Sequence, residues 1–177
     1  EQINTLSVSV IDGYVKNAVG MVYDYTNKNN PILIETFTTN ESGNTILSTV
    51  NELTTPSIIK LVITSGIDIS TGNPITIPMT SIHHKSEFGE LFNFNYKITV
   101  TILSTLATKL IENDNSATLN LETISNYKTG LVTSLGLSTY TDSTGSPSHI
   151  NPATGISIIH SDFIDTYNSE LSNINHL

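Results

Sequence analysis

The sequence predicts an α+β fold in which an antiparallel β-sandwich of transthyretin or immunoglobulin type is followed by a helical region. In the first half of the chain, apolar residues alternate with polar ones, and turn residues recur about every 8 to 12 positions. From about residue 101, apolar residues recur instead at steps of three and four, which is the spacing of one face of a helix.

The first two predicted strands flank the turn Asp12-Gly13, where aspartate tolerates the turn geometry and glycine supplies a positive φ. The strand before the turn has an apolar side and a serine side, as expected when one face is buried. The strand after it places three large apolar residues on one face. The alternating positions are Leu6, Val8 and Val10 in the first strand, and Val15, Val19, Met21 and Tyr23 in the second.

Four more strands follow, separated by polar turn clusters. They are predicted at residues 31–37, 45–50, 57–64 and 75–82. The third of them is a nearly continuous apolar run around Lys60, which is typical of a central strand that is covered on both faces.

Three helices are predicted in the second half. The first begins after a cap at Thr99 or Thr101, and the second runs from Leu119 to Leu135 and ends at Gly136. A Ser-, Gly- and Pro-rich loop at 141–152 precedes the third. The helical spacing of the third is carried by Ile156, Ile159, Phe163, Tyr167, Leu171 and Ile174.

The predicted organisation is therefore a β module at residues 1–85, a connector at 86–100 and a helical module at 101–177. Because no flexible linker separates the parts, we expect the helices to pack on the sandwich or beside it.

The composition excludes several classes of function. The 177 residues include 26 Thr, 21 Ser and 19 Asn, only 13% are charged, and the net charge is −9. Lys and Arg together number only 7 and cannot neutralise many phosphates, so we expect no nucleic-acid partner. No apolar run is long enough for a membrane-spanning helix. The absence of Cys excludes thiolate catalysis and zinc–thiolate sites. The hydroxyl- and amide-rich composition favours an extracellular, cell-surface or virion-surface protein.

Five segments carry a resemblance to a known family, namely Val8–Asp24, Asn40–Asn44, Ile63–Gly72, Val100–Leu106 and Leu135–Leu137. They resemble carboxypeptidase-regulatory-like domains and the helical module that follows such domains in secreted bacterial surface proteins. At Ile102 the chain departs from the family, which has proline there. The resemblance implies a transthyretin-like or immunoglobulin-like sandwich that serves as a spacer, adhesion or assembly module, and it brings no catalytic residue.

One cluster has the residue types of metal ligands, namely His83, His84, Glu87 and Glu90. A zinc site needs three or four convergent ligands, and neighbouring histidines usually point in different directions, so we interpret this stretch as a solvated polar connector. The aspartates Asp12, Asp24 and Asp68 offer oxygens to calcium, but nothing has the spacing of a calcium loop. We interpret them as turn residues and predict no metal or cofactor site.

The remaining candidate sites concern covalent chemistry. An intramolecular isopeptide bond would need a buried lysine that faces an asparagine or aspartate. Lys60 is a better candidate than Lys16. We favour the interpretation that Lys60 lies at a sheet edge and faces solvent. Neither Ser65-Gly66 nor the segment 143–146 has the strand–turn–helix context of a nucleophile elbow, so no enzyme is predicted. Asn40-Glu41-Ser42 is a single glycosylation sequon.

Two functions stay open, with an accessory domain of a longer chain as a third. The first is a structural or adhesive subunit of a filament or surface layer, which assembles by strand addition at a sheet edge. Residues 1–10 are a candidate donor strand, although pairing within their own sheet is favoured. The second is a module that binds carbohydrate or protein. Its aromatic candidates are Tyr14, Tyr25, Tyr140, Phe92, Phe94 and Tyr96, the last three of which alternate as on a strand face.

Overall fold

The computed structural model describes residues 6–47, 57–87, 96–115, 119–153 and 157–160. The strands of the two larger sheets are β1 (Leu6–Ile11), β2 (Val15–Asp24), β3 (Ile32–Thr38), β4 (Asn44–Leu47), β5 (Ile58–Asp68), β6 (Met79–His84) and β7 (Tyr96–Thr101). The remaining elements are the helices α2 (Ile102–Asn113) and α3 (Leu121–Ser134), the two-residue strands β8 (Tyr140–Thr141) and β9 (Pro147–Ser148), and the short 3-10 helix η2 (Ile158–His160).

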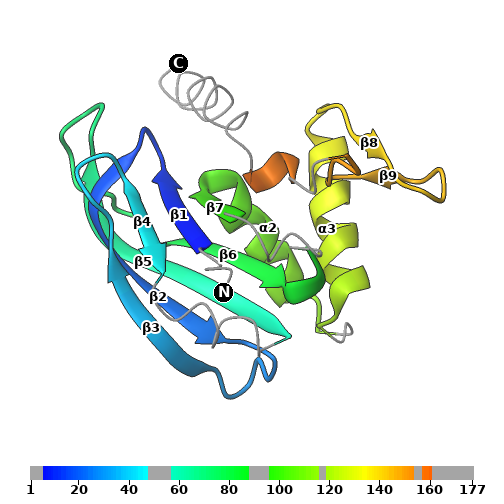
Figure 1. Ribbon diagram of the computed structural model, residues 1–177, viewed down its shortest axis with the longest axis horizontal. Coiled ribbons are helices and arrows are strands. Elements are labelled where there is room, and N and C mark those ends of the chain that lie inside the picture. Colours follow the sequence, from blue (N-terminus) through cyan, green and yellow to red (C-terminus); the bar gives the residue numbers. More distant parts are fainter. Residues whose placement is uncertain (1–5, 48–56, 88–95, 116–118, 154–156, 161–177) are drawn as a thin grey trace, which may run out of the picture.

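The predicted α+β class with mostly antiparallel strands is confirmed. One sheet has the order β4-β1-β7 and the other has the order β3-β2-β5-β6 (Figure 1). Every pair is antiparallel except β1 with β7, which run parallel from Leu6 opposite Tyr96 to Ile11 opposite Thr101. Strand β7 lies in the stretch predicted to be a connector, so part of that stretch belongs to the first sheet. The prediction missed it because its partner, β1, is about 90 residues away in sequence.

The two sheets face each other across one hydrophobic core. The first sheet contributes Leu6, Val8, Val10, Leu47, Ile98 and Val100, and the second contributes Val15, Ala18, Val22, Phe37, Ile59, Leu61, Ile63 and Met79. Since both sheets bury side chains in the same cluster, they are held together mainly by apolar contact.

A bulge in β2 changes which of its residues enter this core. The register with β5 shifts between Lys16 and Val19, and Asn17 has a left-handed backbone with φ of 52°. Val15 is therefore buried, whereas Val19 is exposed and Ala18 faces the core in its place. Val19, Met21 and Tyr23 do share a face, as predicted, but it is the outer face of the sheet.

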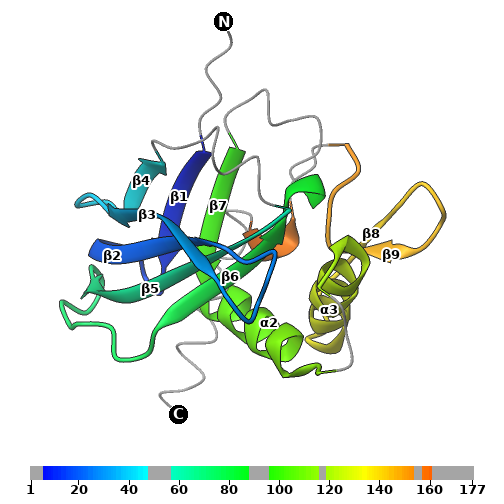
Figure 2. The ribbon, with the colours of Figure 1, turned by 90° about the horizontal axis from the view of Figure 1, so that it is seen from below.

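Helix α2 packs on the outer face of the four-stranded sheet beside β6, as both views in Figures 1 and 2 show. Its N-cap is Thr101, as predicted, and a capping box joins Thr101 to Ser104. Ile58 of β5 packs with Ile111 and Ile124 of the two helices, while its neighbour Ile59 enters the core between the sheets. This end of β5 is thus covered on both faces, which confirms its prediction as a central strand.

Helix α3 ends as the sequence predicts. Gly136 has φ of 74°, and the backbone N–H groups of Gly136 and Leu137 donate to the carbonyls of Thr133 and Val132. These are the two bonds of a Schellman motif, which satisfies carbonyls that the helix leaves unpaired. Leu137 is buried in a cluster with α2 and η2.

The predicted number of helices is not matched. Among the described residues there are two α-helices, and the segment expected to form the third is described only in part, where Ile158–His160 is a 3-10 helix. Most of that segment, 161–174, lies outside the described residues. Within the described part of the chain, neither α-helix has the length and hydropathy needed to cross a membrane.

Candidate functional site

The described members of the histidine–glutamate cluster, His83, His84 and Glu87, do not converge. His83 and His84 are consecutive residues of β6, so their side chains lie on opposite faces. His83 is buried, and its Nε2 lies 2.8 Å from Ser81 Oγ. His84 is half-buried, and burial lowers its pKa. Glu87 is buried as well, so the interpretation as a solvated connector was wrong for these residues. Glu90 lies outside the described residues, and the described ones contain no group of three or more potential metal ligands.

Glu87 instead forms a buried ion pair that the sequence did not reveal. Its Oε2 lies 2.8 Å from Lys128 Nζ, and its Oε1 accepts the backbone N–H of His84 at 3.1 Å. Burial lowers the pKa of Lys128, and the negative charge of Glu87, which acts in the opposite direction, offsets only part of this effect. The pair ties α3 to the end of β6. Lys128 lies inside the helix predicted from Leu119 to Leu135, and the apolar spacing of that helix gave no signal for a buried lysine.

A second buried polar contact lies near the same helix. His149 Nδ1 is 2.7 Å from Ser157 Oγ, and Ser157 Oγ also accepts the backbone N–H of Ile159 at 3.2 Å. Burial, with a smaller contribution from the charge of Lys128, lowers the pKa of His149 to about 3. Both side chains are closed off from solvent, and the serine holds the start of η2.

Lys60 pairs with a carboxylate from α2. Its Nζ lies 3.0 and 3.1 Å from the two carboxylate oxygens of Glu112, and 5.1 Å from the centre of the Tyr25 ring. Tyr25 donates its hydroxyl to the same carboxylate, and burial together with Glu112 raises the pKa of Tyr25 to about 12. The interpretation as an edge lysine was wrong because β5 lies inside its sheet. Lys16 meets Glu41 at 3.3 Å on the surface.

The three candidate calcium ligands are not brought together. Asp12 and Asp68 lie near each other, and burial and the charge of Asp68 raise the pKa of Asp12. Asp24 is at the far end of β2. Asp68 accepts the backbone N–H of Ser70 at 2.8 Å, which is the turn role that the sequence predicts.

The serine motifs and the sequon occupy strands or turns. Ser65-Gly66 lies within β5, and the segment 143–146 forms the turn between β8 and β9. In that turn Asp142 accepts the hydroxyl of Thr144 at 2.6 Å. Asn40 accepts backbone N–H groups of its own turn through Oδ1.

The aromatic candidates form no common platform in the described part of the chain. Tyr25 is buried, Tyr14 is half-buried and Tyr140 is exposed in β8, far along the sequence. Phe92 and Phe94 lie outside the described residues. Tyr96 begins β7, and its side chain is likewise outside them.

One edge of the four-stranded sheet, formed by β3, has no partner strand among the described residues. Strand β3 ends the order of this sheet, and no described strand pairs with its outer side. Ile32 and Leu33 are 59% and 52% exposed there. Figure 1 shows β3 on the rim of the molecule, opposite α3. The other end of the sheet, β6, is covered by α2.

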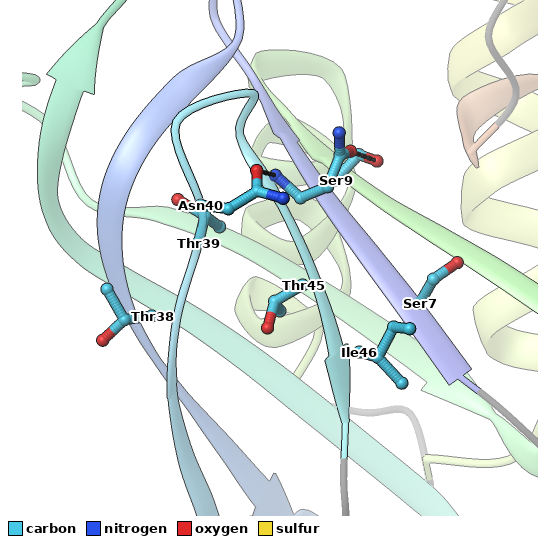
Figure 3. Close-up of a pocket in the computed structure, with 8 residues that line it drawn as sticks. Ser7, Ser9, Thr38, Thr39, Asn40, Thr45 and Ile46 are labelled. Atoms are coloured by element: carbon cyan, nitrogen blue, oxygen red, sulfur yellow. Dashed lines mark hydrogen bonds between the residues drawn. The ribbon is translucent and has the colours of Figure 1, made fainter.

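An open hollow of about 640 Å³ lies beside this edge (Figure 3). Side chains from β1, β4 and the end of β3 surround it, and hydroxyl and amide groups predominate among them. The lining residues are Ser7, Ser9, Thr38, Thr39, Asn40, Asn44, Thr45 and Ile46. Part of this polarity is already satisfied within the protein, because Ser9 donates to Asn44 Oδ1.

Comparison with known proteins gives no relative on which to base an identification. No protein-family model matches the chain, and no curated protein matches it significantly.

Proposed function

We propose that this chain is a non-enzymatic structural or adhesive protein of an extracellular, cell-surface or virion-surface assembly, and that copies associate through the edge of β3. The observation that carries the proposal is the contrast between the two ends of the four-stranded sheet. Helix α2 packs against β6, whereas no described strand pairs with the outer side of β3, where Ile32 and Leu33 are exposed. An open edge is a template for a strand of another chain.

The composition of β3 supports this role. Natural proteins protect solvent-exposed edges with lysines, interior prolines or bulges. Strand β3 reads Ile-Leu-Ile-Glu-Thr-Phe-Thr, without lysine or proline. Strand β3 does have one of these protections, a bulge at Ile34, which has no partner in the pairing with β2. The pairing with β2 is regular from Thr36 to Thr38, and we place the first intermolecular hydrogen bonds in that part of the strand.

The donor strand is not β1. Leu6–Ile11 pairs with both β4 and β7, and its apolar side chains are buried in the core. Its release would break the first sheet, so the described half of the candidate donor, residues 6–10, is used within the subunit. We propose instead that β3 pairs with β3 of a second copy, because a twofold interface uses the same edge on both partners.

The proposed fold type is a transthyretin-like or immunoglobulin-like sandwich with an attached helical module. Two sheets around one core support this proposal, as does the resemblance of the first strands to regulatory-like domains. Such sandwiches commonly serve as spacers and adhesion modules, in agreement with a role that depends on surfaces rather than on a reaction.

The test is sedimentation velocity on the intact chain and on two variants. Leu33→Lys adds a charge at the β3 edge, and Ile77→Lys makes the same change at an exposed residue between β5 and β6. We expect the wild type and Ile77→Lys to associate as concentration rises, and Leu33→Lys to stay monomeric. A wild type that is monomeric throughout would contradict the proposal, and so would association that Leu33→Lys leaves unchanged.

The hollow favours a second candidate function, the binding of a neutral, hydroxyl-rich ligand such as a carbohydrate. Its lining offers hydroxyl and amide groups without a charged side chain. A glycan array with the wild type and Thr38→Val tests it, because loss of a lining hydroxyl should weaken any glycan that binds there. Glycan binding that is equal in both proteins would place the site elsewhere.

A further inference from the structure

His149 connects the last described segments of the chain to the helices. Its backbone N–H donates to Thr129 Oγ1 of α3 at 3.1 Å, and its carbonyl accepts the backbone N–H of Ile158 at 2.8 Å. Its Nδ1 lies 2.7 Å from Ser157 Oγ, which also accepts the backbone N–H of Ile159. A single residue therefore joins the segment after β9 to both α3 and η2.

These segments lie over an apolar cluster of the two helices. We call residues 147–153 and 157–160 the latch. Its η2 part contributes Ile158 and Ile159 to a cluster whose other members, from α2, α3 and the end of α3, are Leu103, Ala107, Leu131, Val132 and Leu137. The cluster shares no residue with the core between the two sheets. Opening of the latch would therefore expose the helical cluster and leave the sandwich core packed.

The surroundings of His149 suit only its neutral form. Its Nε2 is buried and has no hydrogen-bond partner among the described residues. A protonated ring carries a proton on both nitrogens, so Nε2–H would then be a buried donor without an acceptor. At the other nitrogen, Ser157 offers a hydroxyl, which brings no negative charge to offset that of the ring.

Charge opposes protonation of His149 as well. Among the described residues, the charge that acts on it is that of the buried Lys128 of α3, whose Nζ lies 2.8 Å from Glu87 Oε2 just after β6. Burial first, and the charge of Lys128 second, lower the pKa of His149 from 6.5 to about 3. Between these two pH values a proton therefore binds to the open latch and not to the closed one.

We propose that the latch is an acid-sensitive device, in which protonation of His149 releases residues 147–153 and 157–160 from α2 and α3 and exposes the helical cluster while both sheets stay folded. The device involves neither β3 nor the hollow, so it stands or fails independently of the proposed association. Because opening takes up one proton at the histidine, the open fraction should rise about 25-fold from pH 7 to pH 5.

Amide hydrogen exchange of the full chain between pH 7 and pH 5 tests the proposal. After correction for the intrinsic pH dependence of exchange, the amides of Ile158 and Ile159 should lose protection about 25-fold, while those of β2 and β5 keep theirs. His149→Asn should remove this pH dependence, whereas the matched control His160→Asn, at the histidine of η2, should retain it. Constant protection of η2 in the wild type, or an equal loss in β2 and β5, would overturn the proposal. So would a pH dependence that His149→Asn retains or that His160→Asn removes.

Thiol labelling measures the same opening without a change at His149. The chain has no Cys, so a single Val132→Cys reports the exposure of the helical cluster. Division of its labelling rate by that of Thr64→Cys, at an exposed position of β5, cancels the pH dependence of the thiol chemistry. We expect this ratio to rise about 25-fold from pH 7 to pH 5. A ratio that is constant, or that is already close to one at pH 7, would overturn the proposal.

Discussion

Lys128 Nζ lies 2.8 Å from Glu87 Oε2, and the two side chains are only 2% and 3% exposed. The contact joins helix α3 to the end of β6 across 41 residues of sequence. Removing a charge from water is costly, and in a buried ion pair the opposite charge offsets this cost. Loss of one member therefore leaves an unpaired buried charge that destabilises the folded protein.

The first prediction concerns this pair. Lys128→Met should lower the free energy of unfolding by about 3 to 5 kcal/mol, because it leaves a buried carboxylate without its cation. The double variant Lys128→Met, Glu87→Leu removes both charges and should recover most of that loss. Urea unfolding followed by circular dichroism measures the three proteins. If the double variant is as unstable as Lys128→Met, the pair does not act as described.

The second prediction concerns pH. His149 has a pKa of about 3 in the folded protein against 6.5 in an unfolded chain. Below pH 6.5 the unfolded chain therefore binds a proton that the folded protein does not, and the free energy of unfolding falls as the pH falls toward 3. From pH 7 to pH 5 the loss should be about 2 kcal/mol.

The control for this prediction is His149→Asn, which cannot titrate in that window. The carboxylates contribute equally to both proteins, so the difference between the two pH profiles isolates the histidine. The wild type should show the steeper fall between pH 6.5 and pH 4. Parallel profiles would mean that His149 is accessible to protons in the folded state.

The third prediction compares two glycines. A Cβ on Gly20 would lie 2.2 Å from the Phe37 ring, so Gly20→Ala should displace that ring and cost about 1 to 3 kcal/mol. Gly130 lies inside α3 with nothing within 4 Å of such a Cβ, so Gly130→Ala should raise stability by about 0.5 to 1 kcal/mol. Opposite shifts in thermal midpoint are expected, and shifts of the same sign would contradict the packing described.

Local patterns predicted the elements whose signals lie within a few residues. The Thr101 cap, the Gly136 end of α3 and the central position of β5 all follow from short-range rules. The bulge at Asn17 did not, because a single left-handed residue reverses the buried side of β2 without altering the alternation that the sequence shows.

Long-range partners could not be predicted. Strand β7 forms by parallel pairing with β1, which is distant in the sequence. Lys128 is buried against a carboxylate that lies 41 residues away. A polar residue such as His149 carries no sign in its own neighbourhood that folding will bury it. For the same reason the sequence indicated an open sheet edge in general terms, whereas the identity of β3 as that edge came from the strand order.

Amide hydrogen exchange at low and high protein concentration tests the central claim, the association of copies through β3, most directly. The account predicts that amides of Ile32–Thr38 become protected as concentration rises, while the amides of β6, at the covered end of the same sheet, exchange at unchanged rates. Association that protects other segments and leaves β3 unchanged would contradict it, as would exchange that is independent of concentration throughout the chain.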